Sequence, residues 1–280
     1  MTTNPSYFRV FLTFVRNSLV RDMMFPANFI IETISSIGWV SMNIAFYVLI
    51  FHHTDFMGAD AEGGAAWDKY QFFVFLATAM LINNTVQMFF MPNAEEFSEL
   101  IRTGHLDFAL LKPIDTQFLV SLQKVDWSSL ANIGVALLLL GYAVPRLDGF
   151  VPSWAAVLLY PLYVGLGVLV MYSLMIALAA TSVWLGRNQS LYDFWFYITN
   201  FARYPLEIYR GPIGDWLRWT LTFLIPVLVV VNVPARLMAK PLRAEYAWLA
   251  VFAVFATLAA LAGSRWVFTR ALASYRSASS

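Results

Sequence analysis

Long apolar blocks alternate with short polar connections along this chain. A helix needs about 20 mostly apolar residues to cross the hydrocarbon core of a bilayer. Five blocks meet that length, at residues 28–51, 72–91, 127–144, 154–185 and 246–268. The pattern therefore predicts an all-α, polytopic membrane protein with a single transmembrane domain over residues 1–280.

The stretch between the fourth and fifth blocks is less regular. Two shorter apolar pieces, residues 191–204 and 216–233, are interrupted by Pro and Gly at Pro205, Gly211, Pro212, Gly214 and Pro226. At least one piece must span if both termini lie on the same side of the membrane.

Basic residues in short loops set the orientation, because cytoplasmic loops carry an excess of Lys and Arg. The segments before the first span and after the second are basic, with Arg9, Arg16, Arg21, Arg102, Lys112 and Lys124. The loop between these two spans is acidic, with Asp55, Asp60, Glu62 and Asp68 against Lys69. The C-terminal end is again basic, with Arg265, Arg270 and Arg276. We expect both termini in the cytoplasm and therefore an even number of spans, for which six is the natural count.

Residues 5–22 have the pattern of an amphipathic helix lying in the membrane interface. Apolar side chains recur at helical spacing beside the basic ones, at Phe8, Phe11, Leu12, Val15 and Leu19. Such a helix is either a plain membrane anchor or an elbow linked to a gate, and the two readings are compatible.

Composition supports a membrane domain with no soluble catalytic part. Hydrophobic residues make up 60% of the chain and charged residues 12%, and there is no cysteine. Thiolate metal sites and cysteine nucleophiles are therefore excluded. The chain contains no G-x-x-x-x-G-K-[ST], so any ATP must be bound by another polypeptide. Basic patches interleaved with aromatics, as in nucleic-acid-binding proteins, are also missing.

The most informative polar segment is residues 93–113, between the second and third spans. It predicts a short helix that starts at Asn93, with Glu96 as capping-box partner, and ends at Gly104. The helix carries Glu95, Glu96 and Glu99 near its start, Arg102 near its end, and one apolar face of Phe97, Leu100 and Ile101. It either floats on lipid headgroups or docks on a protein. Its acidic side favours a protein, because anionic lipids repel acidic segments.

Two motifs resemble those of the ABC-2 type transporter permeases, in particular the six-helix branch. The first is E-L-I-R-T-G-x-L-D-x-x-L-L-K-P at residues 99–113. The second is the looser Pro, Gly and Trp pattern of residues 204–236, with Tyr204-Pro205, residues 211–217, Ile225-Pro226 and residues 233–236. The second resembles the external hairpin of that family.

The resemblance implies one subunit of an ATP-driven exporter in the cytoplasmic membrane of a prokaryote. Two permease subunits would form the pathway, with a slight preference for a heterodimer, and separate ATPase subunits would carry ATP and Mg²⁺. Residues 94–104 would be the coupling helix that contacts the ATPase, and this chain would bind no cofactor itself.

The same resemblance places the fifth span at residues 190–204 and an external or re-entrant segment at 205–245. That placement puts five basic residues outside, against the usual loop bias: Arg210, Arg218, Arg236, Lys240 and Arg243. The alternative uses residues 216–233 as the fifth span and keeps residues 191–204 in the cytoplasmic interface.

Polar residues inside spans are costly and often functional. They are Glu32, Asn43, Asn83, Asn84, Gln87, Asp126, Asp193, Asn200 and Arg203. Asn83, Asn84 and Gln87 lie within the second span and either bond neighbouring helices or line a pathway, and Asn43 and Asn200 are further candidates. Arg203 and Glu207 are four residues apart and are expected to pair.

Two other functions have weaker support. An ion-coupled carrier would use Glu32, Asp126 or Asp193 as proton-linked sites, and a membrane scaffold would need a polar cluster at one membrane face. His52, His53 and Asp55 lack a suitably spaced further ligand for a metal. Neither G-x-S-x-G nor H-E-x-x-H occurs. We therefore expect a permease rather than an enzyme.

Overall fold

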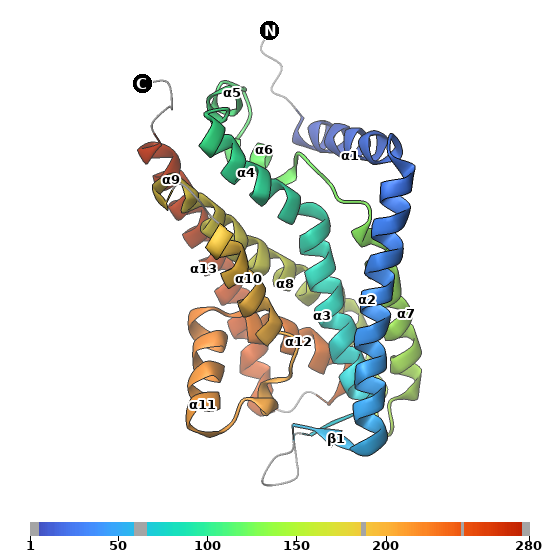
Figure 1. Ribbon diagram of the computed structural model, residues 1–280. Helices are drawn as coiled ribbons and strands as arrows, with labels where there is room; N and C mark the ends of the chain where they lie inside the picture. Colours follow the sequence, from blue (N-terminus) through green and yellow to red (C-terminus); the bar gives the residue numbers. More distant parts are fainter. Residues whose placement is uncertain (1–5, 59–65, 186–188, 242–243, 276–280) are drawn as a thin grey trace.

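The computed structural model describes residues 6–58, 66–185, 189–241 and 244–275, and it is almost entirely helical (Figure 1). The N-terminal half contains α1 (Tyr7–Met23), α2 (Pro26–His53), α3 (Lys69–Phe89), α4 (Met91–Thr103), α5 (Leu106–Leu110), α6 (Thr116–Leu122) and α7 (Ser129–Ala143). The C-terminal half contains α8 (Trp154–Ala180), α9 (Ser182–Leu185), α10 (Gln189–Phe201), α11 (Gly211–Trp219), α12 (Val227–Ala239) and α13 (Ala244–Ser274). A two-stranded antiparallel ribbon joins β1 (Phe56–Met57) to β2 (Trp67–Asp68).

Within the described residues, five helical segments are long and apolar enough to cross a membrane: Pro26–His53, Lys69–Thr103, Ser129–Arg146, Trp154–Leu185 and Tyr246–Ser274. A further candidate is the pair Gly211–Leu224 and Val227–Ala239, bent by 87°. The predicted all-α, polytopic fold class is confirmed. The predicted residues Asp60, Glu62, Arg243 and Arg276 lie outside the described part of the chain.

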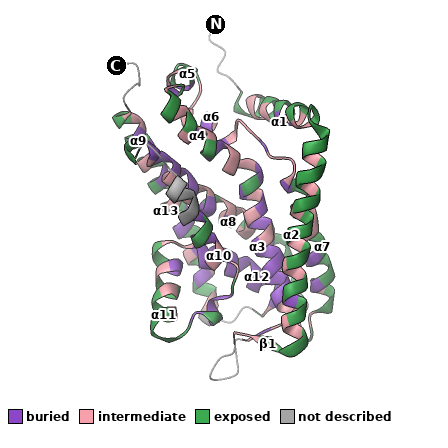
Figure 2. Cartoon of the chain, viewed as in Figure 1, coloured by how far each residue is buried: buried purple, intermediate pink, exposed green. Residues whose placement is uncertain are grey.

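The centre of the bundle is formed by α3, α8 and α12. All of α12 is buried, from Val227 to Ala239, including its polar Asn232 and Arg236. In contrast, the only buried residue of α2 is Tyr47. Figure 2 shows this difference, with burial concentrated in the central helices and α2 largely exposed. The outer face of α2 is therefore available to lipid or to another subunit.

The close approach of α8 to the other two central helices depends on Gly167. A Cβ atom at this position would lie 2.7 Å from Ile82 Cδ1 of α3 and 3.1 Å from the Val230 carbonyl oxygen of α12. Small residues at such contacts let helix backbones pack closely inside a membrane. Gly165, two residues earlier and therefore on the other side of α8, has nothing within 4 Å of the same added atom.

The segment of residues 206–240 starts and finishes at the same end of the bundle. At its start, Trp67 Nε1 donates to Glu207 Oε2 over 2.9 Å. At its finish, Lys240 Nζ donates to the Ala66 carbonyl oxygen over 2.8 Å. Both contacts are with the β2 region, so the segment forms a hairpin, in which α11 is exposed and α12 is buried. The bend follows a π-helical turn at residues 220–224 and lies at Pro226, whose missing N–H breaks the helix.

The predicted ion pair between Arg203 and Glu207 is wrong. Glu207 pairs instead with Arg236 of α12, and both side chains are nearly buried, with 6% and 11% of their surface exposed. Pro205 ends the helical path between residues 203 and 207, so the four-residue spacing no longer places their side chains on one face. The Arg236 guanidinium also lies 3.8 Å from the centre of the Tyr246 ring.

Different elements lie at the two ends of the bundle. Figure 1 shows α1, α4, α5 and the last turns of α13 at one end, and β1 with α11 at the other. The predicted fifth span, 190–204, corresponds to α10, whose 13 residues rise only about 20 Å. Since a hydrocarbon core is about 30 Å thick, α10 needs neighbouring segments to cross it, and the limits of this span stay a prediction.

Replacing Gly167 with Ala should destabilise the protein by about 1–3 kcal/mol, because the added methyl group overpacks the α3–α8–α12 contact. The measurement is the thermal unfolding midpoint of the full chain in detergent. Gly165→Ala is the matched control on the same helix and should be neutral or slightly stabilising. Equal midpoints for the two variants would show that the close approach at Gly167 does not limit packing.

Replacing Glu207 with Gln should destabilise the protein by about 3–5 kcal/mol, because it removes the negative charge from the buried Glu207–Arg236 pair. Asp215→Asn is the control, since it breaks the exposed Arg218–Asp215 pair of 3.2 Å and should cost at most about 1 kcal/mol. Chemical or thermal unfolding of the two variants measures the difference. A Glu207→Gln protein as stable as Asp215→Asn contradicts the assignment.

Candidate functional site

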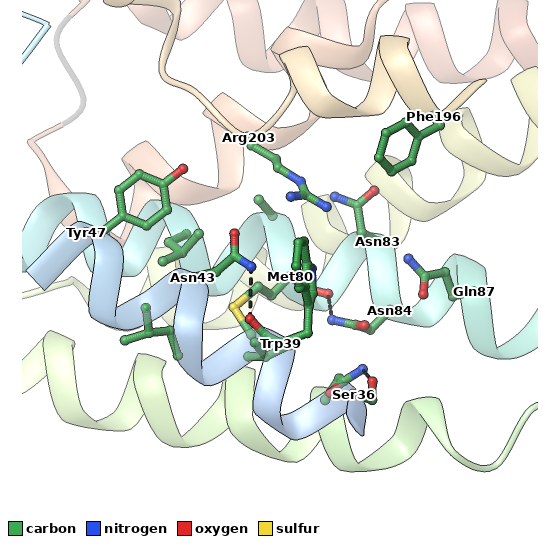
Figure 3. Close-up of a pocket in the computed structure, with 15 residues that line it drawn as sticks. Ser36, Trp39, Asn43, Tyr47, Met80, Asn83, Asn84, Gln87, Phe196 and Arg203 are labelled. Atoms are coloured by element: carbon green, nitrogen blue, oxygen red, sulfur yellow. Dashed lines mark hydrogen bonds between the residues drawn. The ribbon is translucent and has the colours of Figure 1, made fainter. Parts of the chain in front are cut away.

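A cleft of about 230 Å³ opens between α2 and α10, with α3 as its floor (Figure 3). Its walls come from two helical stripes with the same spacing. The stripe on α2 is Ser36, Trp39, Val40, Asn43, Ile44 and Tyr47. The stripe on α3 is Leu76, Ala79, Met80, Asn83, Asn84 and Gln87. Each follows the i, i+3, i+4, i+7 rule for one helix face. Asn132 of α7, Phe196 of α10 and Arg203 complete the lining.

The amide side chains of the cleft are only partly hydrogen-bonded. Asn43 Nδ2 donates to the Trp39 carbonyl oxygen over 2.9 Å, and Asn84 Nδ2 donates to that of Met80 over 2.8 Å. Both bonds stay within one helix. Asn132 Nδ2 donates to Ser36 Oγ and so joins α7 to α2. The Oδ1 atoms of Asn83 and Asn132 are buried without a partner, an arrangement that costs free energy until a ligand or water supplies a donor.

Arg203 carries the only charge among the described residues that line the cleft. It follows the C-terminal end of α10, and Figure 3 shows its guanidinium pointing towards the side-chain amide of Asn83. No carboxylate of the described residues lies within ion-pair distance of Arg203, because Glu207 is held by Arg236 and Trp67. The cleft is therefore polar at its floor and positively charged on one wall.

Four of the five predicted pathway residues, Asn43, Asn83, Asn84 and Gln87, meet in this cleft, whereas Asn200 does not line it. Their role in a pathway stays a prediction. Sequence reasoning did not place Ser36 and Asn132 here, and it assigned Arg203 to an ion pair. The shared spacing of the α2 and α3 stripes is the signal that would have found Ser36. Nothing in the sequence brings residue 132 or 203 to the same place.

The candidate proton-linked carboxylates have other surroundings. Glu32 and Asp126 line a shallow hollow beside Arg21 and Asp22, where α1 meets α2. Asp126 accepts hydrogen bonds of 2.6 Å from both Ser128 Oγ and Ser129 Oγ at the start of α7. Ser128 N also donates to Asp126 Oδ1 over 2.9 Å, so this carboxylate is held by the turn that precedes α7. The side chain of Asp193 lies outside the described residues. Within the described part of the chain, no three His, Asp or Glu side chains form a metal-binding group.

The start of the predicted coupling helix needs correction. α4 begins at Met91, only one residue after α3, and Asn93 lies inside it rather than capping it. Asn93 Nδ2 donates to the carbonyl oxygens of Phe89 and Lys124, each over 2.7 Å, and Oδ1 accepts from Lys124 N over 2.8 Å. Because α3 leads almost directly into α4, Asn93 is free to clamp the chain before α7. The predicted end at Gly104 is confirmed, with a left-handed φ of 75°.

The apolar face of α4 points into the protein. Phe97 is fully buried and lies 5.5 Å, between ring centres, from Phe268 of α13. Leu100 and Ile101 also pack against the core. Glu96 pairs with Lys124 over 2.9 Å. α4 is therefore a fixed part of the bundle rather than a helix floating on lipid.

Five exposed residues of α4, of α5 and of the position after α5 are together called the α4–α5 tip: Glu95, Glu99, Arg102, Phe108 and Leu111. Arg102 Nε donates to Glu99 Oε2 over 2.8 Å, and this hydrogen bond lowers the pKa of the Glu99 carboxyl. Phe108 is 68% exposed and Leu111 is 81% exposed. Sequence reasoning missed these two because they continue a helical apolar pattern that ordinarily faces a core.

Three contacts tie the loop behind the tip to other elements. Arg265 of α13 donates to Asp115 Oδ2 over 2.7 Å, and this hydrogen bond lowers the pKa of the Asp115 carboxyl. Ser18 Oγ of α1 accepts from Val125 N over 3.0 Å, and the Tyr7 ring packs edge-on against Phe118 at 4.9 Å. The N-terminal helix thus contacts the loop that holds α4, while its Phe8 is exposed.

Comparison with known proteins matches the chain to a family. The sequence model of a family described as ABC-2 family transporter protein matches residues 37–279. No curated protein and no solved structure matches the chain. The match covers most of the chain, including the cleft helices, α4 and the hairpin of residues 206–240. The chain therefore belongs to the ABC-2 family of transporter proteins and is a multi-pass membrane permease of the ABC type.

Proposed function

We propose that this chain is the transmembrane subunit of an exporter powered by ATP hydrolysis on a separate subunit, which docks at the α4–α5 tip. The observation that carries the proposal is the position of α4 at the surface of the bundle. The charged side of α4 faces outward, as do Phe108 of α5 and Leu111 after it. The other face of α4 is held in the bundle by Phe97. A surface with exposed aromatic and aliphatic side chains ringed by charges suits a protein partner.

The coupling would be mechanical. A push on α4 reaches α3 directly, since only Phe90 separates the two helices. It reaches α13 through Phe97–Phe268 and Asp115–Arg265. The movement of α3 would reach the cleft, because Asn83, Asn84 and Gln87 are on α3. Tilting of packed helices between two discrete arrangements would change which side the cleft faces.

The cleft suits half of a pathway. α2 forms one wall of it yet buries only Tyr47, and Trp39 and Phe196 at the opening are 60% and 54% exposed. A second permease subunit placed across α2 and α10 would close the cleft. The subunit is either a second copy or a related chain, with the slight preference for a heterodimer that the family resemblance implies.

Orientation and cofactor follow from the same proposal. The basic segments and the α4–α5 tip would lie in the cytoplasm of a prokaryote, together with both termini, since the ends of α1 and α13 lie near α4 (Figure 1). ATP and Mg²⁺ would bind the ATPase partner rather than this chain. The rival ion-coupled carrier is less well supported, because the Asp126 carboxylate is engaged by the hydroxyls of Ser128 and Ser129.

Cysteine labelling tests this orientation cleanly, because the chain has no native Cys. Ile213→Cys is at an exposed position of α11 (77%) and should react with a membrane-impermeant maleimide added outside intact spheroplasts. Glu99→Cys should react only after permeabilisation, and Asp148→Cys, in the loop after the third span, should label from outside. If Ile213→Cys labels only after permeabilisation while Asp148→Cys labels from outside, residues 216–233 form the fifth span instead.

Polar substitution of the tip should remove the ATPase. We expect a tagged native chain, isolated in mild detergent, to co-purify with an ATP-binding cassette ATPase identified by mass spectrometry. The double variant Phe108→Ser with Leu111→Ser should lose about 30-fold in affinity if one of these residues is a docking anchor worth about 2 kcal/mol. Val151→Ser, which changes a side chain 87% exposed elsewhere, should keep the partner. Transport in vesicles that follows a proton gradient without ATP contradicts the proposal.

A further inference from the structure

The cleft holds a positive charge that no described carboxylate neutralises. Arg203 lines it, and the carboxylate nearest in sequence, Glu207, is committed to Arg236 and Trp67. A charged side chain at membrane depth is expensive and usually either pairs or serves a ligand. An anion that enters the cleft would restore the missing charge balance.

The neighbouring amides add to the capacity for oxygen ligands. A guanidinium has five N–H donors in a planar fork that matches the oxygens of a carboxylate or phosphate. Asn83 faces it in Figure 3. Turning the Asn83 amide so that its oxygen accepts from Arg203 would satisfy one or two of these donors and leave the others unused. Asn43 and Gln87 present further amide groups to the same space.

The rest of the lining is apolar and aromatic. Trp39, Tyr47 and Phe196 surround the polar floor, together with aliphatic residues such as Leu76. The cleft is open on the side where Trp39 and Phe196 are exposed. A small inorganic ion would leave this apolar surface uncovered, whereas a molecule with an acidic group and an apolar body would cover both parts.

We propose that the cleft binds an amphiphilic anion, with its acidic phosphate or carboxylate on Arg203 and its apolar body along Trp39 and Phe196. This inference rests on the proposed function, because it names the substrate class of the pathway to which the cleft belongs. The arginine supplies charge selectivity, and the amides of Asn83 and Gln87 supply hydrogen bonds to the acidic group. Cationic amphiphiles of the same length would be rejected, because they would meet an unpaired guanidinium.

The test uses the full native chain purified in a neutral maltoside detergent and follows its thermal unfolding by tryptophan fluorescence. The probes are hexyl phosphate, hexyltrimethylammonium and inorganic phosphate, each titrated separately. A ligand that binds only the folded chain raises the midpoint according to its concentration relative to its Kd. We expect hexyl phosphate to raise the midpoint saturably, inorganic phosphate to bind at least about tenfold more weakly, and hexyltrimethylammonium to have no effect.

Substitutions locate the effect. Arg203→Gln should weaken binding of hexyl phosphate at least about tenfold, the loss expected from a hydrogen-bonded charge, and Arg203→Lys should recover part of it. Arg146→Gln is the matched control, since it removes an exposed arginine that lies over the Tyr142 ring outside the cleft. If Arg203→Gln does not yield folded protein, Asn83→Asp carries the test. Its carboxylate would neutralise Arg203 and should weaken binding to a similar extent.

Three outcomes overturn the inference. They are equal binding of hexyl phosphate and hexyltrimethylammonium, equal binding of hexyl phosphate and inorganic phosphate, and undiminished binding by Arg203→Gln or, in its place, Asn83→Asp. A purely structural arginine would lower the starting midpoint of its variants without changing selectivity among probes. The measurement needs neither ATP nor an ATPase. A failed anion site therefore leaves the co-purification result intact, and a failed co-purification leaves the anion site intact.

Discussion

The packing of α3 against α8 and α12 is the interaction on which the remaining structure depends. It brings backbones together at Gly167, where a single added carbon would reach both Ile82 and the Val230 carbonyl. Because one face of α3 is fixed in this core, the stripe from Leu76 to Gln87 faces the cleft. Because α4 begins one residue after α3 ends, α3 also connects directly to the α4–α5 tip. Core, cleft and α4–α5 tip are thus connected through α3.

Charge placement in the C-terminal half follows from how the hairpin of residues 206–240 folds. Glu207, Asn232 and Arg236 of this hairpin are buried, where no bulk water can satisfy their polar groups, so each needs a protein partner. Asn232 provides one such bond by accepting from Leu206 N over 3.1 Å. Glu207 and Arg236 provide another by pairing across the hairpin. That pair stabilises the hairpin and also engages Glu207, the carboxylate nearest to Arg203 in sequence, so that no carboxylate of the described residues neutralises the charge in the cleft.

In the segment between α3 and α7, tertiary contacts decide which side chains of the sequence motif face outward. Its glutamates and its apolar residues are visible in the sequence, but which of them face out is decided by contacts with distant segments. Phe97 turns inward because Phe268 of α13 is there. Asn93 clamps the Lys124 backbone, and Asp115 holds Arg265. Phe108 and Leu111 are left exposed by the same folding, and they complete a surface whose charged part alone was recognisable.

The sequence by itself determined the membrane-spanning class, the helices with long apolar blocks and the glycine that ends α4. These depend on local chemistry: hydrocarbon requires continuous apolar helices, and a left-handed helix end favours glycine. It also indicated Asn43, Asn83, Asn84 and Gln87 as costly polar positions.

Only the tertiary structure decided which polar groups meet. It placed Asn93 inside α4 instead of at its start, moved Glu207 from Arg203 to Arg236, and brought Asn132 and Arg203 to the cleft. Helical spacing predicts neighbours within one helix, but it is silent about contacts between segments dozens of residues apart. Those contacts depend on how whole helices pack and on where the chain turns back.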